Sequence, residues 1–169
     1  MPTKPDALLT GQIDDELYRR FDAVIQTEGP ITRELLIKRV INSLDIYKAS
    51  WRLNKHFQLI LDRFADRMSE EEGLEVYHAR EERDNVLRTD SRDIRFSYQI
   101  PPCEAANALV LVIQESSKRL RKWQLYPLFV RTLGYSKCGS ELKILFDKTV
   151  RYALEHEKVH RSNSSTYYI

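Results

Sequence analysis

The sequence predicts a mainly α-helical protein with small β-hairpins, an α+β fold, in which one structural unit occurs twice. Three observations lead to this prediction. Apolar residues recur at spacings of three and four along six segments. The two halves of the chain align with each other. Only 5 of the 169 residues are glycine, while 42% are hydrophobic and 31% charged, which is typical of an ordinary globular protein.

The internal alignment covers about 45 positions of each half. An offset of 88 places, which becomes 89 after a one-residue gap, gives eight identical pairs. These are Glu16/Glu104, Val24/Val112, Ile25/Ile113, Gln26/Gln114, Leu44/Leu133, Lys48/Lys137, Leu53/Leu142 and Phe57/Phe146. Because apolar character is also kept at further positions with helical spacing, a duplication explains the pattern better than chance.

Three helices are expected in the first copy. The first one ends at the glycine-proline breaker at 29–30. The second follows Thr32, a suitable N-cap residue. After a break at 45–47 comes the longest helix, which is expected to run through Met68 and to stop with Gly73 as its C′ residue.

A hairpin is expected after these helices, at 74–89, where LEVYHAR and VLRT flank the charged turn EERDN. Residues 90–100 alternate apolar and polar side chains, which predicts an extra strand or an extended packing arm. The expected organisation is a tail at 1–12, a first repeat at 13–89, a connecting arm at 90–102 and a second repeat at 103–169.

The second copy predicts the same elements in the same order. One helix follows the proline pair at 101–102, with Glu104 in its first turn, and two more run over about 120–133 and 139–156. KVHR, the turn SNSS and TYYI then form a hairpin. Three helices followed by a hairpin is the order of a winged helix. We therefore expect tandem winged-helix (helix-turn-helix) repeats, packed together to enlarge a small core.

Several classes of function are not expected. The glycines form neither GxGxxG nor GxxxxGK, so no nucleotide-binding loop is encoded. The longest apolar run, at 108–113, is far shorter than the ~20 residues that cross a bilayer, which predicts a cytoplasmic protein without membrane contact. Cys103 and Cys138 fit neither a disulfide framework nor a zinc site, and two reduced thiols are expected.

Catalytic and metal-binding patterns are weak as well. The four histidines lack HExxH spacing. The Glu-Leu-Lys triplet at 141–143 has the letters of a restriction-type nuclease site, but it falls in a helix, whereas such nucleases place it on a strand. Neither cysteine has an activating motif nearby. We therefore expect a protein that is not an enzyme and needs no metal or cofactor.

Charge is distributed unevenly along the chain. Residues 103–169 hold 11 basic and 6 acidic side chains, a net charge of +5, whereas residues 1–102 hold 16 basic and 19 acidic ones, a net charge of −3. The two parts sum to the net charge of +2 for the whole chain. A nucleic-acid partner is therefore expected to bind the second copy.

Several segments resemble a domain family of unknown function. EGPITRELLIKRVINSLDIYKASWRLNKHF is similar to its N-terminal half, and QIPPCEAANALVLVIQE with LGYSKCGSELKILFDKTVRYALEHEKV to its second half. That family lies at the C-terminus of large bacterial proteins that combine a helicase-like motor with an endonuclease of the very-short-patch-repair type. The resemblance covers about residues 16–165 and implies association with DNA-processing or DNA-defence machinery. It implies no catalytic residue, because the motor and the nuclease of those proteins lie in other domains.

Basic residues at the expected helix tips and hairpins are the candidates for DNA contact. In a helix-turn-helix unit the start of the last core helix enters the major groove, while the wing follows the backbone. In the first copy the candidates are Lys48, Arg52 and Lys55, beside Trp51. In the second copy they are Lys118, Arg119, Arg121, Lys122, Lys137, Lys143, Lys158 and Arg161.

The sequence thus predicts a non-catalytic accessory module that binds double-stranded DNA alongside a helicase or nuclease subunit. The alternative is a protein–protein interaction or self-association module without direct DNA contact, in which the charged residues are solvated helix faces. A continuous positive face that contains the tips of both third helices would favour DNA, whereas an apolar patch across Trp51 or Trp123 would favour a protein partner.

Overall fold

The computed structural model describes residues 8–81, 85–89, 95–116, 119–162 and 165–169. Within these residues the protein is mainly helical, with six α-helices and two three-stranded sheets, which confirms the predicted α+β class. The chain divides into two compact units, Met1–Glu70 with Leu74–Glu82 and Glu71–Gly73 with Arg83–Ile169. Each unit has its own cluster of buried hydrophobic residues.

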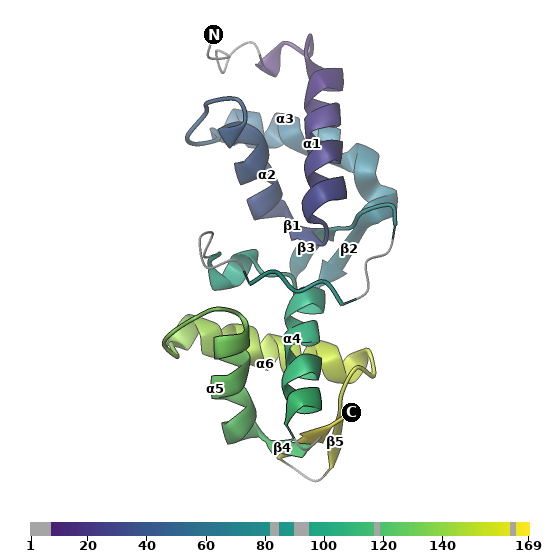
Figure 1. Ribbon diagram of the computed structural model, residues 1–169. Coiled ribbons are helices and arrows are strands. Elements are labelled where there is room, and N and C mark those ends of the chain that lie inside the picture. Colours follow the sequence, from purple (N-terminus) through teal and green to yellow (C-terminus); the bar gives the residue numbers. More distant parts are fainter. Residues whose placement is uncertain (1–7, 82–84, 90–94, 117–118, 163–164) are drawn as a thin grey trace. The chain divides into compact units, whose positions relative to one another are not determined.

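The first unit holds three helices and most of a small sheet, of which only the residues Glu71–Gly73 are grouped with the second unit. Its elements are α1 (Asp14–Glu28), β1 (Ile31–Thr32), α2 (Arg33–Asn42), α3 (Trp51–Leu61), the 3₁₀ helix η2 (Asp62–Arg67), β2 (Met68–Glu71) and β3 (Leu74–Tyr77). The strand order is β1-β3-β2, and β1 pairs antiparallel with β3 so that Ile31 lies opposite Tyr77. The strands lie where α1 ends and α2 begins (Figure 1).

The first two helices form where the sequence predicts them. α1 buries Leu17, Phe21 and Ile25 on one face, and the ring of Phe21 packs edge-on against Phe57 of α3 at 5.4 Å. The helix stops at Gly29, which lies against the chain after β3. A Cβ atom added to Gly29 would stand 2.8 Å from the backbone nitrogen of Ala79. This close approach explains why a residue without a side chain is needed there.

The prediction for the third helix and the first hairpin is wrong. α3 ends at Leu61, and the hairpin spans residues 68–77 instead of 74–89. In the sequence the helical spacing of apolar residues continues past Leu61, because Phe64 is fully buried although it lies in the 3₁₀ helix η2. Gly73 is not a helix C′ residue. Glu72 and Gly73 both have positive φ angles, 49° and 79°, as the two-residue turn of a tight hairpin requires.

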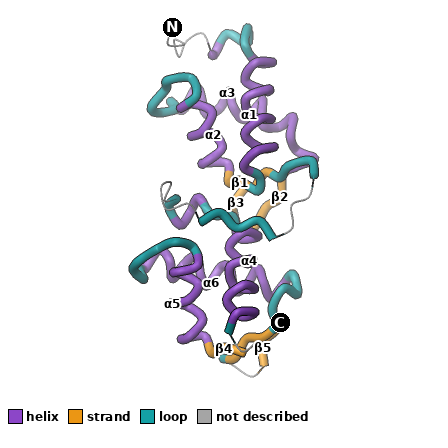
Figure 2. The backbone as a smooth tube through the Cα atoms, viewed as in Figure 1, coloured by secondary structure: helices purple, strands orange, loops and turns teal. Residues whose placement is uncertain are grey.

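The second unit repeats this order of elements. They are the 3₁₀ helix η3 (Ser97–Gln99), α4 (Pro102–Glu115), β4 (Arg119–Arg121), α5 (Lys122–Thr132), α6 (Ser140–Glu155), β5 (His160–Ser162) and β6 (Thr166–Tyr168). The strand order is β4-β6-β5, with both pairs antiparallel. The three helices and the final hairpin confirm the prediction to within a few residues. Figure 2 shows the strands as short orange segments.

Three features of the fold differ from the prediction. The short strands β1 and β4 were not expected at all. Residues 95–100 form an irregular segment and the 3₁₀ helix η3 in place of a strand, and the rest of the expected arm, 90–94, lies outside the described residues. Residues 85–89 contain no strand, and part of the turn expected there, 82–84, is not among the described residues either.

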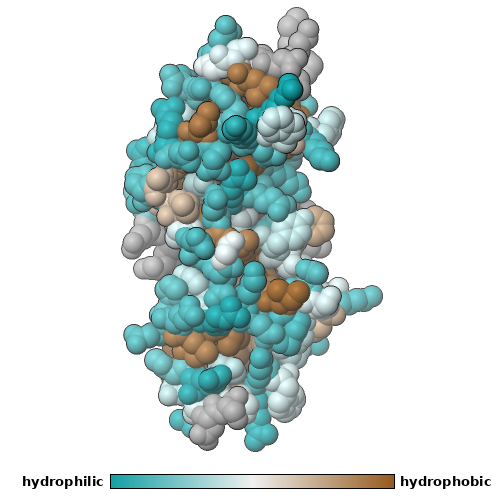
Figure 3. Space-filling view, turned by 180° about the vertical axis from the view of Figure 1, so that it is seen from behind, coloured by the Kyte–Doolittle hydropathy of each residue, from teal (hydrophilic) through white to brown (hydrophobic). Residues whose placement is uncertain are grey.

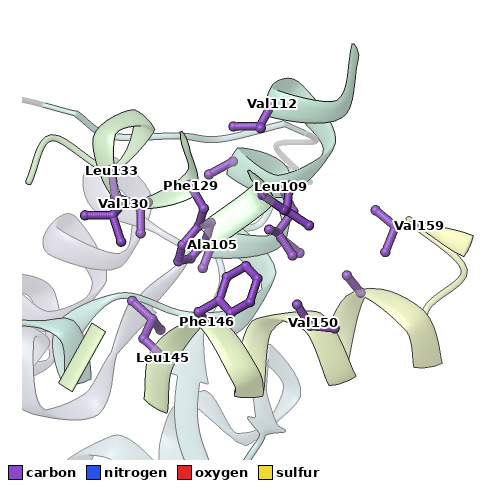
Figure 4. Packing of buried hydrophobic residues seen from close by; sticks show 14 of the residues in the cluster. Ala105, Leu109, Val112, Phe129, Val130, Leu133, Leu145, Phe146, Val150 and Val159 are labelled. Atoms are coloured by element: carbon purple, nitrogen blue, oxygen red, sulfur yellow. The ribbon is translucent and has the colours of Figure 1, made fainter. Parts of the chain in front are cut away.

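The core of the second unit is built between α4 and α6. Ala105, Ala106 and Ala108 of α4 are fully buried, and these small side chains allow α6 to lie close to α4. Phe146 of α6 points into the cluster and packs against Phe129 of α5 at 5.4 Å between ring centroids (Figure 4). β4 and β6 close the core with a buried residue each, Leu120 and Tyr167, which lie opposite one another.

Candidate nucleic-acid interface

Two arginines share the solvent-exposed face of the second unit's sheet. Arg119 and Arg121 are exposed at either end of β4, while Leu120 between them is buried. Because successive side chains of a strand point to opposite faces, the two guanidinium groups lie on the side of the sheet away from the core. The sequence analysis did not predict that these two arginines lie on a strand.

The pairing of the strands sets other side chains beside these arginines. Arg119 lies opposite Tyr168 on β6, and Tyr168 lies opposite His160 on β5. The guanidinium carbon of Arg119 is 5.6 Å from the centroid of the Tyr168 ring, and the His160 ring is 5.4 Å from it on the other side. Together with the parallel row formed by Arg121, Thr166 and Ser162, these residues form what we call the basic sheet face.

Lys122 lies next to this face, at the first residue of α5. Its backbone N–H donates a hydrogen bond of 2.9 Å to the carbonyl of Ser165, which fixes the start of α5 beside the hairpin. Its ammonium group lies 3.0 Å from one carboxylate oxygen of Asp147, and Lys143 donates to the other.

The single negative charge of Asp147 does not neutralise the two positive charges of Lys122 and Lys143. Burial would raise the pKa of Asp147, but hydrogen bonds from Lys143 and Lys122 hold it below its usual value. The carboxylate therefore stays ionised at neutral pH. Two ammonium groups against one carboxylate leave a net positive charge between the start of α5 and α6.

Three other candidates of the second unit are placed apart from this face. Lys158 donates a hydrogen bond of 3.1 Å to the side-chain oxygen of Asn107 on α4 and is half-buried. Arg161 lies opposite the buried Tyr167, so it belongs to the other face of the sheet, although it is exposed at the edge strand. Lys137 is exposed in the turn before α6. Lys118 falls outside the described residues.

The candidates of the first unit gather at the start of α3. The hydroxyl oxygen of Ser50 accepts a hydrogen bond from the backbone N–H of Leu53, which caps the helix. Trp51 and Arg52 therefore occupy its first turn, with the guanidinium carbon 5.6 Å from the indole ring. Lys55 follows one turn later, and all three side chains are exposed, as is Lys48 before the helix.

The hairpin of the first unit differs in charge from that of the second. Residues 68–77 contain four glutamates, at 70, 71, 72 and 75, and no lysine or arginine. The strand that corresponds to β4 is β1, whose two residues, Ile31 and Thr32, are both buried. Although the two sheets share their strand order, only the second carries a basic face.

The histidines and cysteines do not form a metal-binding cluster within the described part of the chain. The described residues contain no group of three or more histidine, cysteine, aspartate or glutamate side chains that could hold a metal ion. His56 pairs with Asp14 at 2.7 Å, and His156 stacks on Tyr152. Burial and the nearby carboxylate of Glu71 raise the pKa of the Cys103 thiol, which disfavours the reactive thiolate.

Comparisons with known proteins add no assignment. No family model, no curated protein and no solved structure matches the chain. Among the described residues, no helix has both the length and the apolar character to cross a membrane.

The candidates named from the sequence did not include Tyr168, Thr166 or Ser162 of the basic sheet face. The last strand was expected, but its partner β4 was not, so nothing joined Tyr168 to Arg119. The alternation of RLR, with one apolar residue between two arginines, was the available signal. Three residues are too few for such a pattern to stand out from a helix start, and α5 does begin immediately afterwards.

Proposed function

We propose that the protein is a non-catalytic accessory module that binds double-stranded DNA, built from two winged-helix units. The order of helix, strand, two helices and two strands, with the first strand paired to the last, supports the winged-helix interpretation. The observation that carries the DNA-binding proposal is the basic sheet face, because Arg119 and Arg121 are exposed side by side on the strand next to the hairpin.

Binding at this face follows from charge. The two guanidinium groups and the net positive charge of the Lys122 and Lys143 pair attract the phosphate backbone, and guanidinium groups bind phosphate oxygens with two parallel hydrogen bonds. The start of α5 adds the positive end of a helix dipole. Contacts of this kind fix position on the duplex without reading its sequence, so the affinity falls steeply with added salt.

The first unit contributes through α3 in this proposal. Arg52 and Lys55 lie in the first two turns of the last core helix, which is the part of a helix-turn-helix unit that enters the major groove. Its hairpin plays no part, since four glutamates would repel the phosphates. The resemblance to the C-terminal domains of helicase and endonuclease fusion proteins supports the proposal that such a module acts beside a motor or nuclease subunit.

A protein-interaction or self-association module is the second candidate, and exposed aromatic residues favour it. The side chains of Trp51 and Trp123 are 71% and 70% exposed, and Tyr47 is 99% exposed. Exposed aromatic side chains are typical of binding surfaces. On the face of the molecule drawn in Figure 3, however, hydrophobic residues form small separate groups between hydrophilic ones.

A fluorescence anisotropy titration with a labelled duplex tests the proposal. Non-specific DNA binding has dissociation constants of roughly 1–100 μM at physiological salt, and tighter ones at low salt. We expect saturable binding at micromolar protein in low salt, weakening as salt is added. Absence of binding at tens of micromolar protein in low salt would refute DNA binding and leave the protein-interaction candidate.

A further inference from the structure

The first of the two rows on the basic sheet face consists of three planar side chains. The phenol ring of Tyr168 lies in the middle strand, with the guanidinium of Arg119 on one side and the imidazole of His160 on the other. Arg119 and His160 are exposed and Tyr168 is half-buried. Aromatic rings and guanidinium planes are the groups on which proteins stack unpaired bases.

The neighbouring row supplies groups for a sugar–phosphate backbone. Arg121, Thr166 and Ser162 lie opposite one another across the three strands, on the same face as the flat row. They offer one guanidinium and two hydroxyls, all of which can donate hydrogen bonds to phosphate oxygens. A stacking row beside a phosphate-binding row matches the two sides of a single strand, whose bases and backbone run side by side.

The first unit shows that this arrangement is not a general consequence of the fold. There Ile31 lies opposite Tyr77, as Leu120 lies opposite Tyr167 in the second unit. The residues just beyond that pair are Pro30 and His78, whereas the second unit has Arg119 and Tyr168 there. Pro30 is buried, and the His78 ring bonds the hydroxyl of Ser69 at 2.8 Å. The row of Arg119, Tyr168 and His160 is thus specific to the second unit.

We propose that the basic sheet face binds an unpaired DNA strand, stacking its bases on the row of Arg119, Tyr168 and His160. The inference rests on the proposed function, because it assigns a preferred form of DNA to the same face. The faces of bases inside a duplex are covered by their neighbours, so only an unpaired strand offers them to the row. A duplex still binds through its phosphates, but it gains nothing from the tyrosine ring.

The test compares a labelled thymidine oligomer of about 20 nucleotides, longer than the ~4–16 nucleotides that a small single-strand-binding domain covers, with a duplex of the same length. Losing a stacking side chain costs about 5- to 100-fold in single-strand affinity. We expect Tyr168→Leu to weaken oligomer binding by that factor and to change duplex binding by less than about twofold. Tyr168→Phe retains the ring and is expected to bind the oligomer like the wild type.

A second pair of variants keeps the test valid if Tyr168→Leu fails to fold. Arg119 and Arg161 belong to the same small sheet, are both exposed and carry the same charge, but they stand on opposite faces. Arg119→Leu is expected to weaken oligomer binding at least fivefold more than Arg161→Leu. Equal effects of the two variants would overturn the proposal.

The outcomes separate this inference from the proposed function. Duplex binding by the wild type, combined with oligomer binding that Tyr168→Leu leaves unchanged, overturns the stacking row and leaves the DNA-binding module intact. An equal loss of both forms of DNA in Tyr168→Leu also overturns it. If the wild type binds neither form, both proposals fail together.

Discussion

Both carboxylate oxygens of Glu104 accept hydrogen bonds from the guanidinium group of Arg95, at 2.8 and 2.6 Å. Glu104 is fully buried in the first turn of α4, and Arg88 adds a side-chain hydrogen bond of 2.8 Å and one from its backbone N–H. The hydroxyl of Tyr135 donates to the carbonyl of Arg95. This buried charged cluster ties the segment before α4 to the helices of the second unit.

Replacing Glu104 tests how far the second unit depends on this cluster. Glu104→Gln leaves two guanidinium groups without their counter-ion, and breaking a buried pair in this way costs roughly 3–5 kcal/mol in the free energy of unfolding. Glu16→Gln is the matched control, because Glu16 occupies the aligned position in the first copy and pairs with Arg20 at the surface. It is expected to cost less than about 1 kcal/mol. Urea unfolding followed by circular dichroism measures both.

The same cluster predicts how stability depends on pH. Burial would raise the pKa of Glu104, but the hydrogen bond and charge of Arg95 and the charge of Arg88 hold it below its usual value. A carboxyl group whose pKa is lowered by folding contributes stability above its unfolded pKa of about 4.3, and this contribution is lost as the pH falls through the folded value.

We therefore expect the free energy of unfolding to fall below about pH 5, and to fall less steeply in Glu104→Gln. Urea unfolding at a series of pH values measures both slopes. A variant with the same acid sensitivity as the wild type would show that Glu104 is not responsible.

The backbone around Gly29 leaves no room for a side chain. A Cβ atom there would lie 2.5 Å from the carbonyl oxygen of Ile25, a backbone atom that cannot turn aside. Gly29→Ser is expected to destabilise the protein by roughly 1–3 kcal/mol.

Gly139→Ser is the control for this substitution. Gly139 has open space around it and is the N-cap residue of α6, where serine is preferred to glycine by a few tenths of a kcal/mol. Thermal unfolding should therefore shift in opposite directions for the two serine variants. A shift in the same direction for both would contradict the geometry described at one of these positions.

The ends of α2 and α5 are built alike but use different residues. Asp45 has a φ angle of 58° and Gly134 one of 89°, each just after the helix. The residue that follows each of them donates a hydrogen bond back into the helix, Ile46 to Ile41 and Tyr135 to Val130. Glycine adopts this left-handed conformation without strain.

Asp45→Gly is therefore expected to stabilise the protein by about 0.5–1 kcal/mol, and Gly134→Ala to destabilise it by about 1 kcal/mol. Chemical unfolding of both variants checks the pair. A loss of stability in Asp45→Gly would mean that the aspartate side chain supports the turn.

The elements that the sequence predicted well are those with a strong period and a clear breaker. α1 ends at a glycine-proline pair, and α4 starts at a proline pair. The end of α3 was missed because Phe64 keeps the helical spacing although the chain has already tightened into a 3₁₀ turn. The strands β1 and β4 were missed because two or three residues carry no readable period.

The candidate interface was predictable only in part. Its basic residues were visible in the sequence, but their grouping depends on strand register. Register sets Arg119 beside Tyr168 and moves Arg161 to the opposite face. The hydrogen bond that draws Lys158 towards Asn107 joins residues 51 positions apart, which local patterns cannot reveal.

The salt dependence of duplex binding tests the central claim most directly. Each phosphate contact that is lost lowers the slope of log affinity against log salt by about 1. Arg119→Gln combined with Arg121→Gln is expected to flatten the slope by about 2 between about 50 and 200 mM salt. Arg19→Gln combined with Arg131→Gln removes the same charge from two exposed helical positions and should leave the slope close to that of the wild type. Equal slopes for the two double variants would contradict DNA binding through the basic sheet face.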